Sequence, residues 1–160
     1  MSTLAVNIHL SGFETIEAAL ARLNPFQAGH LLEALARLIR ESVRERLLAG
    51  GPSPDGAAWA PNLENRRPIL HRSGTLARSI DYAVQGMQAI VGSGLIYAAI
   101  HQFGGTILPK SAERLAFWIG NRQVFARKVT MPPRPYIGIS ADDRVELVQA
   151  TVAHLRSLFP

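Results

Sequence analysis

Cysteine is absent from this sequence of 160 residues, which excludes disulfides, thiol nucleophiles and thiolate metal sites. No apolar run approaches the ~18 uninterrupted residues that a membrane-spanning helix needs, so no membrane partner is expected. The first residues have no basic stretch followed by a long apolar block, and we therefore expect no signal peptide. Hydrophobic residues make up 48% of the sequence and charged residues 18%, a composition that indicates one globular domain over residues 1–160.

The sequence also lacks the motifs of nucleotide-binding loops and of common catalytic sites. Its five histidines lie far apart and form no H-x-H or H-E-x-x-H pattern, so we expect no zinc site. Gly92-Ser93-Gly94 falls short of the G-x-S-x-G nucleophile elbow and predicts a turn. Asp142 and Asp143 begin a predicted helix, where acidic side chains complement the helix dipole. We therefore expect no catalytic residue, metal or cofactor.

Acidic residues are scarce in one segment of a chain whose net charge is +5. Between residues 105 and 140 six basic residues stand against the single acid Glu113, so this segment carries a charge equal to that of the whole protein. A solvated basic surface is one interpretation, and a surface that faces DNA or an acidic partner is the other. The basic residues are Lys110, Arg114, Arg122, Arg127, Lys128 and Arg134.

Apolar periodicity predicts the main helices. Residues 4–10 alternate as a half-buried strand does, and a helix follows with Ser11 three residues before Glu14, the spacing of a capping box. The clearest helix begins at Asn24-Pro25, with Gln27 positioned to cap it, and ends at Gly50-Gly51. The last helix begins at Ser140 with Asp143 at its third position, and its predicted apolar stripe is Val145, Val148, Val152, Leu155 and Phe159.

Short strands are predicted between these helices. Residues 82–84 and 89–91 form two strands joined by a turn, and residues 115–128 form a hairpin around Gly120-Asn121. Residues 96–103 favour a short helix that Gly104-Gly105 ends, and residues 134–139 suggest an edge strand because Pro135 cannot donate to a central ladder. This order predicts an α+β fold whose helices pack on one face of a mostly antiparallel sheet.

Residues 50–68 form a long Pro-rich loop or arm without apolar periodicity. We expect this loop to be poorly ordered in an isolated subunit and to become ordered against a neighbour. Trp59 is either an anchor on that neighbour or folds back on its own domain. Further along, the spacing of Tyr97 and His101 places them on one helix face close to Phe103, and a core histidine is favoured there over an acid–base one.

Four phrases in order give the sequence a resemblance to the phage virion morphogenesis family, the family of Mu G-like and P2-type tail completion proteins. The resemblance covers residues 4–158, and its phrases are PSPDGAAWAPNL (52–63), ILHRSGTLARSI (69–80), VGSGLIYAAIHQFGG (91–105) and RPYIGISADD (134–143).

The resemblance implies a structural virion protein rather than an enzyme, acting in tail completion or head–tail joining. It implies a homo-oligomeric ring with other neck or tail proteins as partners, and a location in the virion after assembly in the host cytoplasm. In such a ring the summed positive charge would either favour DNA passing through the opening or seat an acidic neighbour. The expected contact residues are Trp59, Tyr97, His101, Phe103, Arg114, Arg122, Arg127, Lys128 and Arg134. The alternative is a basic nucleic-acid-binding module that uses residues 110–134.

The alternation in the hairpin at 115–128 predicts which of these side chains face outward. Leu115, Phe117 and Ile119 point to one side and need a core, so Arg114 and Trp118 point to the other. Arg127 and Lys128 are expected on opposite sides of the return strand, with the apolar helices packing the ring. The alternative is that acidic residues elsewhere in the chain, such as Asp81 or Glu146, pair with the basic residues of the hairpin and neutralise their charge.

Overall fold

A three-stranded antiparallel sheet lies on one side of the molecule. The structure is a computed structural model that describes residues 4–6 and 13–159. The sheet has the order β1 (Leu4–Val6), β3 (Gln88–Ser93), β2 (Ile80–Gln85), and Tyr82 pairs with Val91. The predicted strand pair is thus confirmed. Of the strand predicted at 4–10, Leu4–Val6 is observed, whereas Ile8 and Leu10 lie outside the described residues.

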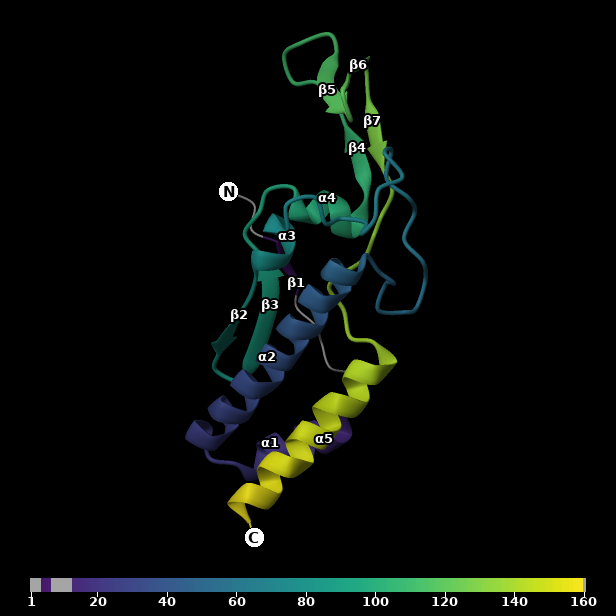
Figure 1. Cartoon of the computed structure of the whole chain (residues 1–160). Coiled ribbons are helices and arrows are strands. Elements are labelled where there is room, and N and C mark those ends of the chain that lie inside the picture. Colours follow the sequence, from purple (N-terminus) through teal and green to yellow (C-terminus); the bar gives the residue numbers. More distant parts are fainter. Residues whose placement is uncertain (1–3, 7–12, 160) are drawn as a thin grey trace.

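Helix α2 (Pro25–Ala49) is the central element and lies between this sheet and helix α5 (Ala141–Leu158) (Figure 1). It begins with the predicted capping box, in which Asn24 accepts from the Gln27 backbone and the Gln27 side chain accepts in return. It ends at Gly50, whose φ of 81° is the left-handed conformation that glycine adopts easily. Its apolar stripe is buried, which confirms the prediction.

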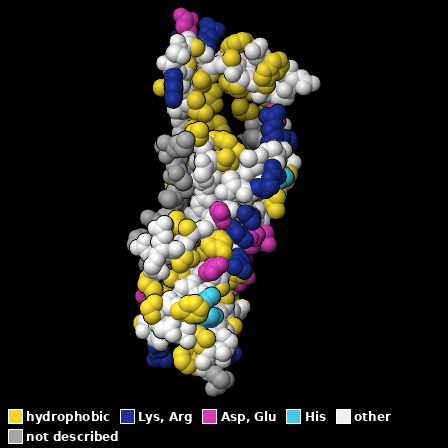
Figure 2. Space-filling model, turned by 90° about the vertical axis from the view of Figure 1, so that its left-hand side faces the viewer, with side chains coloured by type: hydrophobic (Ala, Val, Ile, Leu, Met, Phe, Trp, Pro, Cys, Tyr) yellow, Lys and Arg dark blue, Asp and Glu magenta, His cyan; other side chains and the backbone are white. Residues whose placement is uncertain are grey.

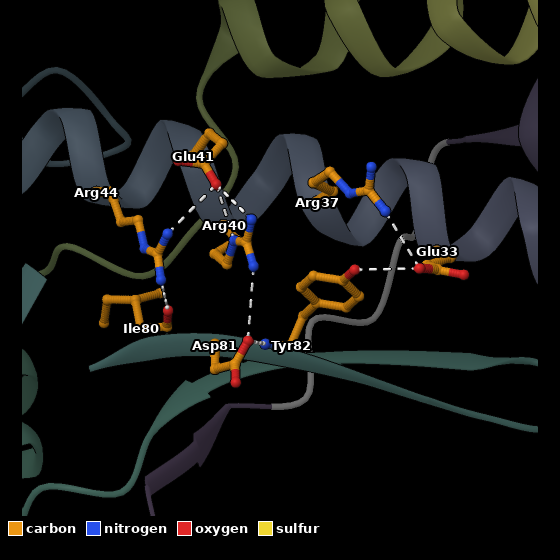
Figure 3. A network of polar contacts seen from close by, with 8 residues as sticks. All are labelled: Glu33, Arg37, Arg40, Glu41, Arg44, Ile80, Asp81 and Tyr82. Atoms are coloured by element: carbon orange, nitrogen blue, oxygen red, sulfur yellow. Dashed lines mark hydrogen bonds and ion pairs between the residues drawn. The ribbon is translucent and has the colours of Figure 1, made fainter. Parts of the chain in front are cut away.

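Polar side chains also tie α2 to the edge strand β2 (Figure 3). Arg44 donates to the carbonyl of Ile80 at 2.8 Å, and Arg40 lies 3.7 Å from the Asp81 carboxylate. The Tyr82 hydroxyl donates to Glu33 at 3.3 Å, and the Arg40 guanidinium lies over the Tyr82 ring. Asp81 therefore pairs with Arg40 of α2 rather than with the basic hairpin.

The other two long helices agree only in part with the prediction. Helix α1 (Glu14–Arg22) has Phe13 at its N-cap and no side-chain cap, while Ser11 lies outside the described residues. Helix α5 has the predicted Ser140–Asp143 capping box. Its predicted apolar stripe is confirmed only in part. Val148 packs against the core, but Val145 and Phe159 are exposed, and Leu147 and Thr151 are buried instead. Asp143 pairs with Arg46 of α2 at 3.0 Å, and residues four and eight positions later share its face.

Two small two-stranded sheets project beyond the body (Figure 1). Strand β4 (Gly105–Ile107) pairs with β7 (Val129–Met131), and β5 (Leu115–Ile119) pairs with β6 (Arg122–Ala126). The hairpin β5–β6 confirms the prediction, whereas the pair β4–β7 was not predicted. We refer to residues 105–131 as the arm, and to residues 50–68 only as the loop. The short helices α3 (Thr75–Arg78) and α4 (Ala98–Phe103) lie near its base, and Gly104 ends α4 as predicted.

The edge strand predicted at 134–139 is wrong. These residues are irregular, and side chains take the place of a neighbouring strand. The Gln102 amide oxygen accepts from the backbone of Tyr136 and Ile137, and its NH2 donates to the Ile137 carbonyl at 3.0 Å. Arg46 donates to the Tyr136 carbonyl at 2.8 Å. The segment therefore has hydrogen-bond partners without belonging to any sheet.

Candidate assembly surface

The Pro-rich loop is held by its own tryptophan. Trp59 is only 6% exposed, and its indole N–H donates to Ser53 Oγ at 3.0 Å and to the Pro135 carbonyl at 2.9 Å. Of the two interpretations that the sequence left open, the structure has Trp59 folded back on its own chain. The ring is therefore not exposed to a neighbour in this conformation.

Arg134 is likewise not part of the basic surface, because its side chain is 3% exposed. Its guanidinium donates to the carbonyls of Ala60 at 2.7 Å and Pro61 at 2.8 Å, so it holds the loop against the body. Burial without a carboxylate partner lowers its pKa, since desolvation penalises the charged form. Trp59 and Arg134, both expected as contact residues, instead position the loop.

A cavity of about 550 Å³ lies between the arm, the loop and helices α3 and α4. His101 lines it, with the Tyr97 ring edge-on at 5.9 Å, and the buried Nδ1 of His101 has no hydrogen-bond partner in the described structure. Burial, and secondarily the charge of Arg134, lower the pKa of His101. This favours the neutral imidazole, as the core interpretation of His101 predicted. Tyr97 is partly exposed, and Phe103 lies at the surface.

The arm exposes large apolar side chains that its own chain leaves uncovered. Trp118 is 60% exposed and Phe125 57% exposed, while the opposite face of the hairpin is half-buried toward the cavity. The expected alternation is thus present. Figure 2 shows hydrophobic side chains gathered at this end of the molecule, with Lys and Arg among them. The exposed apolar residues of the arm and its base are Phe103, Ile107, Leu108, Trp118 and Phe125.

The packing surface of a ring is expected on the apolar helices, whereas the exposed apolar residues are concentrated on the arm. The exposed apolar residues on the long helices, such as Phe26 and Val145, are scattered singly along different helices. The sequence signal for the arm surface was a hairpin with apolar residues on both faces. The body of the protein can cover only one face of such a hairpin, so apolar residues on the other face stay exposed.

The five other basic residues of the segment are all exposed on the arm. None of them takes part in an ion pair within residues 4–6 and 13–159. Arg127 and Lys128 follow the last residue of β6, so the prediction that they alternate along that strand is wrong. The five residues are Lys110, Arg114, Arg122, Arg127 and Lys128.

The described part of the chain offers no candidate metal centre. Within these residues no group of three or more His, Asp or Glu side chains could hold a metal ion. No helix among them is long and apolar enough to cross a bilayer. What this surface offers is contact: exposed rings and cations on a projecting β-structure.

Comparison with known proteins finds one matching family and two relatives. The family described as "Phage virion morphogenesis family" matches residues 9–156. "Mu-like prophage FluMu G protein 2" of Haemophilus influenzae is 27% identical over 147 residues, which are 90% of this chain and 91% of that protein. "Putative capsid assembly protein G" of Escherichia phage Mu is 39% identical over 82 residues, 51% of this chain and 43% of that protein. No solved structure gives a significant match.

The family match covers nearly the whole described structure, from α1 to Arg156 in the last turn of α5, and includes the loop, α4 and the arm. The resemblance that four separate sequence phrases suggested is therefore confirmed, and this chain belongs to the phage virion morphogenesis family.

Proposed function

We propose that this protein is a structural subunit that completes the tail, or joins tail to head, in a tailed phage or prophage. The subunits form a ring at the neck or tail end, with other neck or tail proteins as partners and DNA passing through the opening. The protein is incorporated in the virion after assembly in the host cytoplasm. It has no catalytic role.

The observation that carries this proposal is the arm. A projecting two-stranded hairpin is marginally stable by itself, and exposed rings together with unpaired cations typically mark a contact surface. Trp118 and Phe125 each keep more than half of their surface exposed in the described part of the chain. A relative named for capsid assembly and another from a Mu-like prophage support a role in building the particle.

The decisive experiment is electron microscopy of phage particles produced without this protein. We expect filled heads and separate tails, because the joining component is missing. Restoring the gene in trans should restore joined particles. Intact infectious particles without the protein would contradict the proposal.

A second candidate function is nucleic-acid binding, which the five unpaired basic residues of the arm favour. A surface that neutralises five phosphates would lose affinity for duplex DNA by about 500-fold between ~50 and ~200 mM salt. Apolar contacts between subunits are not screened in this way. Light scattering and DNA binding measured across this salt range therefore separate the two functions: an oligomer that persists while DNA binding disappears supports assembly.

A further inference from the structure

The exposed face of the arm has an apolar centre. In the β5–β6 register Trp118 lies opposite Gln123, and Phe125 lies opposite Ala116. Opposed residues project to the same side, so both rings occupy one face as a diagonal pair. This face is opposite to that of Phe117 and Ile119, and the cavity is lined by these two residues and also by Trp118.

Two cations lie at one end of this apolar centre. Arg114 precedes and Arg127 follows the paired residues Leu115 and Ala126, so both side chains leave the hairpin at its open end. The arm as a whole contains five basic residues and one acid, a net charge of +4.

The body carries a groove of the opposite character. It has a volume of about 630 Å³ and lies between the C-terminal half of α2, residues 51–56 of the loop and the first turns of α5. Leu38, Pro52 and Pro54 supply apolar lining. Its lining contains one basic residue, Arg46, against six acids, which gives a net charge of −5: Glu41, Glu45, Asp55, Asp142, Asp143 and Glu146.

Part of this acidity is already neutralised and part is free. Asp143 pairs with Arg46, and Glu41 pairs with Arg40 and Arg44. Glu45 and Glu146 are exposed and enter no ion pair in the described portion of the chain. The groove therefore combines an apolar lining with an acidic rim, whereas the arm combines an apolar centre with basic surroundings.

We infer that the arm of one copy docks in the α2–α5 groove of the next copy. The occupant is a second copy because the same chain supplies both complementary surfaces. The arm projects away from α5, which forms one wall of the groove, so the arm points away from the groove of its own copy (Figure 1). Each copy then offers one arm and one groove, which is a head-to-tail contact. Such contacts generate a ring when the rotation between copies closes. This inference rests on the ring proposed above and names its interface.

The test uses two variants of the full chain. The arm variant is Arg114→Gln/Trp118→Ser/Arg127→Gln, and the groove variant is Glu45→Gln/Glu146→Gln. All five positions are exposed, so both variants should keep the thermal midpoint of the dilute wild-type monomer. Each variant alone should lose the oligomer in light scattering, with at least a tenfold higher dissociation constant than the wild type.

Mixing distinguishes a head-to-tail contact from a symmetric one. The groove variant keeps an intact arm and the arm variant keeps an intact groove, so an equimolar mixture should form a complex of two chains and nothing larger. A symmetric contact between two arms would give no such complex, because one arm of every mixed pair is defective.

Matched controls make the same change of charge, and a similar loss of exposed apolar area, at positions outside the proposed contact. Arg22→Gln/Phe26→Ser/Arg156→Gln matches the arm variant, and Glu14→Gln/Glu17→Gln matches the groove variant; both controls should retain the wild-type oligomer. A wild-type oligomer in the arm or groove variant, a mixture that stays monomeric, or a wild-type protein without oligomers would each overturn the docking. Head–tail joining is tested separately by particles that lack the protein, so the two proposals fail independently.

Discussion

Trp59 illustrates, at the scale of single residues, how a side chain that looks like an anchor for a partner can hold its own fold. Its N–H has two acceptors in the same chain, and its ring is buried. Trp59→Ala should lower the free energy of unfolding by about 3–5 kcal/mol, because the cavity left behind is large. Trp59→Phe should cost about 1–2 kcal/mol through the lost hydrogen bonds.

Urea unfolding of dilute monomer measures these costs, and Phe103→Ala is the control because the Phe103 ring is exposed. An unchanged free energy of unfolding in Trp59→Ala, combined with a weakened oligomer, would support the anchor interpretation instead.

His101 gives the fold a dependence on pH. Burial, and then the charge of Arg134, lower its pKa, so the unfolded chain takes up a proton at a higher pH than the folded chain does. Stability is therefore lost as the pH falls below ~6.5, the ordinary value for histidine. The free energy of unfolding measured at pH values from about 7.5 to about 5 should fall in the wild type and fall less in His101→Asn.

Carboxyl titration should contribute little in this window. Burial raises the pKa of Asp143, but hydrogen bonds from Ser42 and Ser140 and the charge of Arg46 outweigh it and leave the pKa below the ordinary value. The same pH slope in His101→Asn and in the wild type would contradict the role assigned to His101.

Among the elements, α4 replaces a strand as the hydrogen-bond partner of residues 136–137. One amide side chain, that of Gln102, makes three hydrogen bonds to this segment. Gln102→Met keeps the length of the side chain but leaves buried backbone groups unpaired, at about 1–3 kcal/mol for each. We expect the free energy of unfolding to fall by about 3–5 kcal/mol. Gln123→Met on the arm is the matched control, and a similar small loss in both variants would contradict the clamp.

For the whole molecule, the arm and the body should differ in protection from protease. The sequence predicts a poorly ordered loop at 50–68 in an isolated subunit, but Trp59 and Arg134 hold the centre of that loop. We therefore expect trypsin to cut dilute protein first after the arm residues Lys110, Arg114 and Arg127.

At concentrations where the protein is assembled, arm cleavage should slow by at least tenfold, since the docked arm is covered. Cleavage after Arg156 of α5 should not change, and mass spectrometry identifies the sites. First cleavage inside the loop at 50–68 would instead support the prediction that this loop is poorly ordered in an isolated subunit. Equal arm cleavage at all concentrations would argue against a covered arm.

Local interactions explain what the sequence determined. The capping boxes at Asn24 and Ser140 join residues three positions apart, and the left-handed end of α2 needs only Gly50. The hairpin β5–β6 depends on an alternation and a turn within twelve residues. Family membership was equally accessible, because its phrases are contiguous stretches of sequence.

Only the tertiary structure decided which residues are covered and which are presented. Trp59 finds its acceptor 76 positions away at Pro135, and residues 136–137 find Gln102 more than 30 positions away, so no local pattern distinguishes an anchor from a core ring or a strand from a clamped segment. The acidic groove combines three separate segments, whereas the arm gathers its cations in one. Burial and electrostatic fields depend on distance in space rather than in sequence, and folding alone sets that distance.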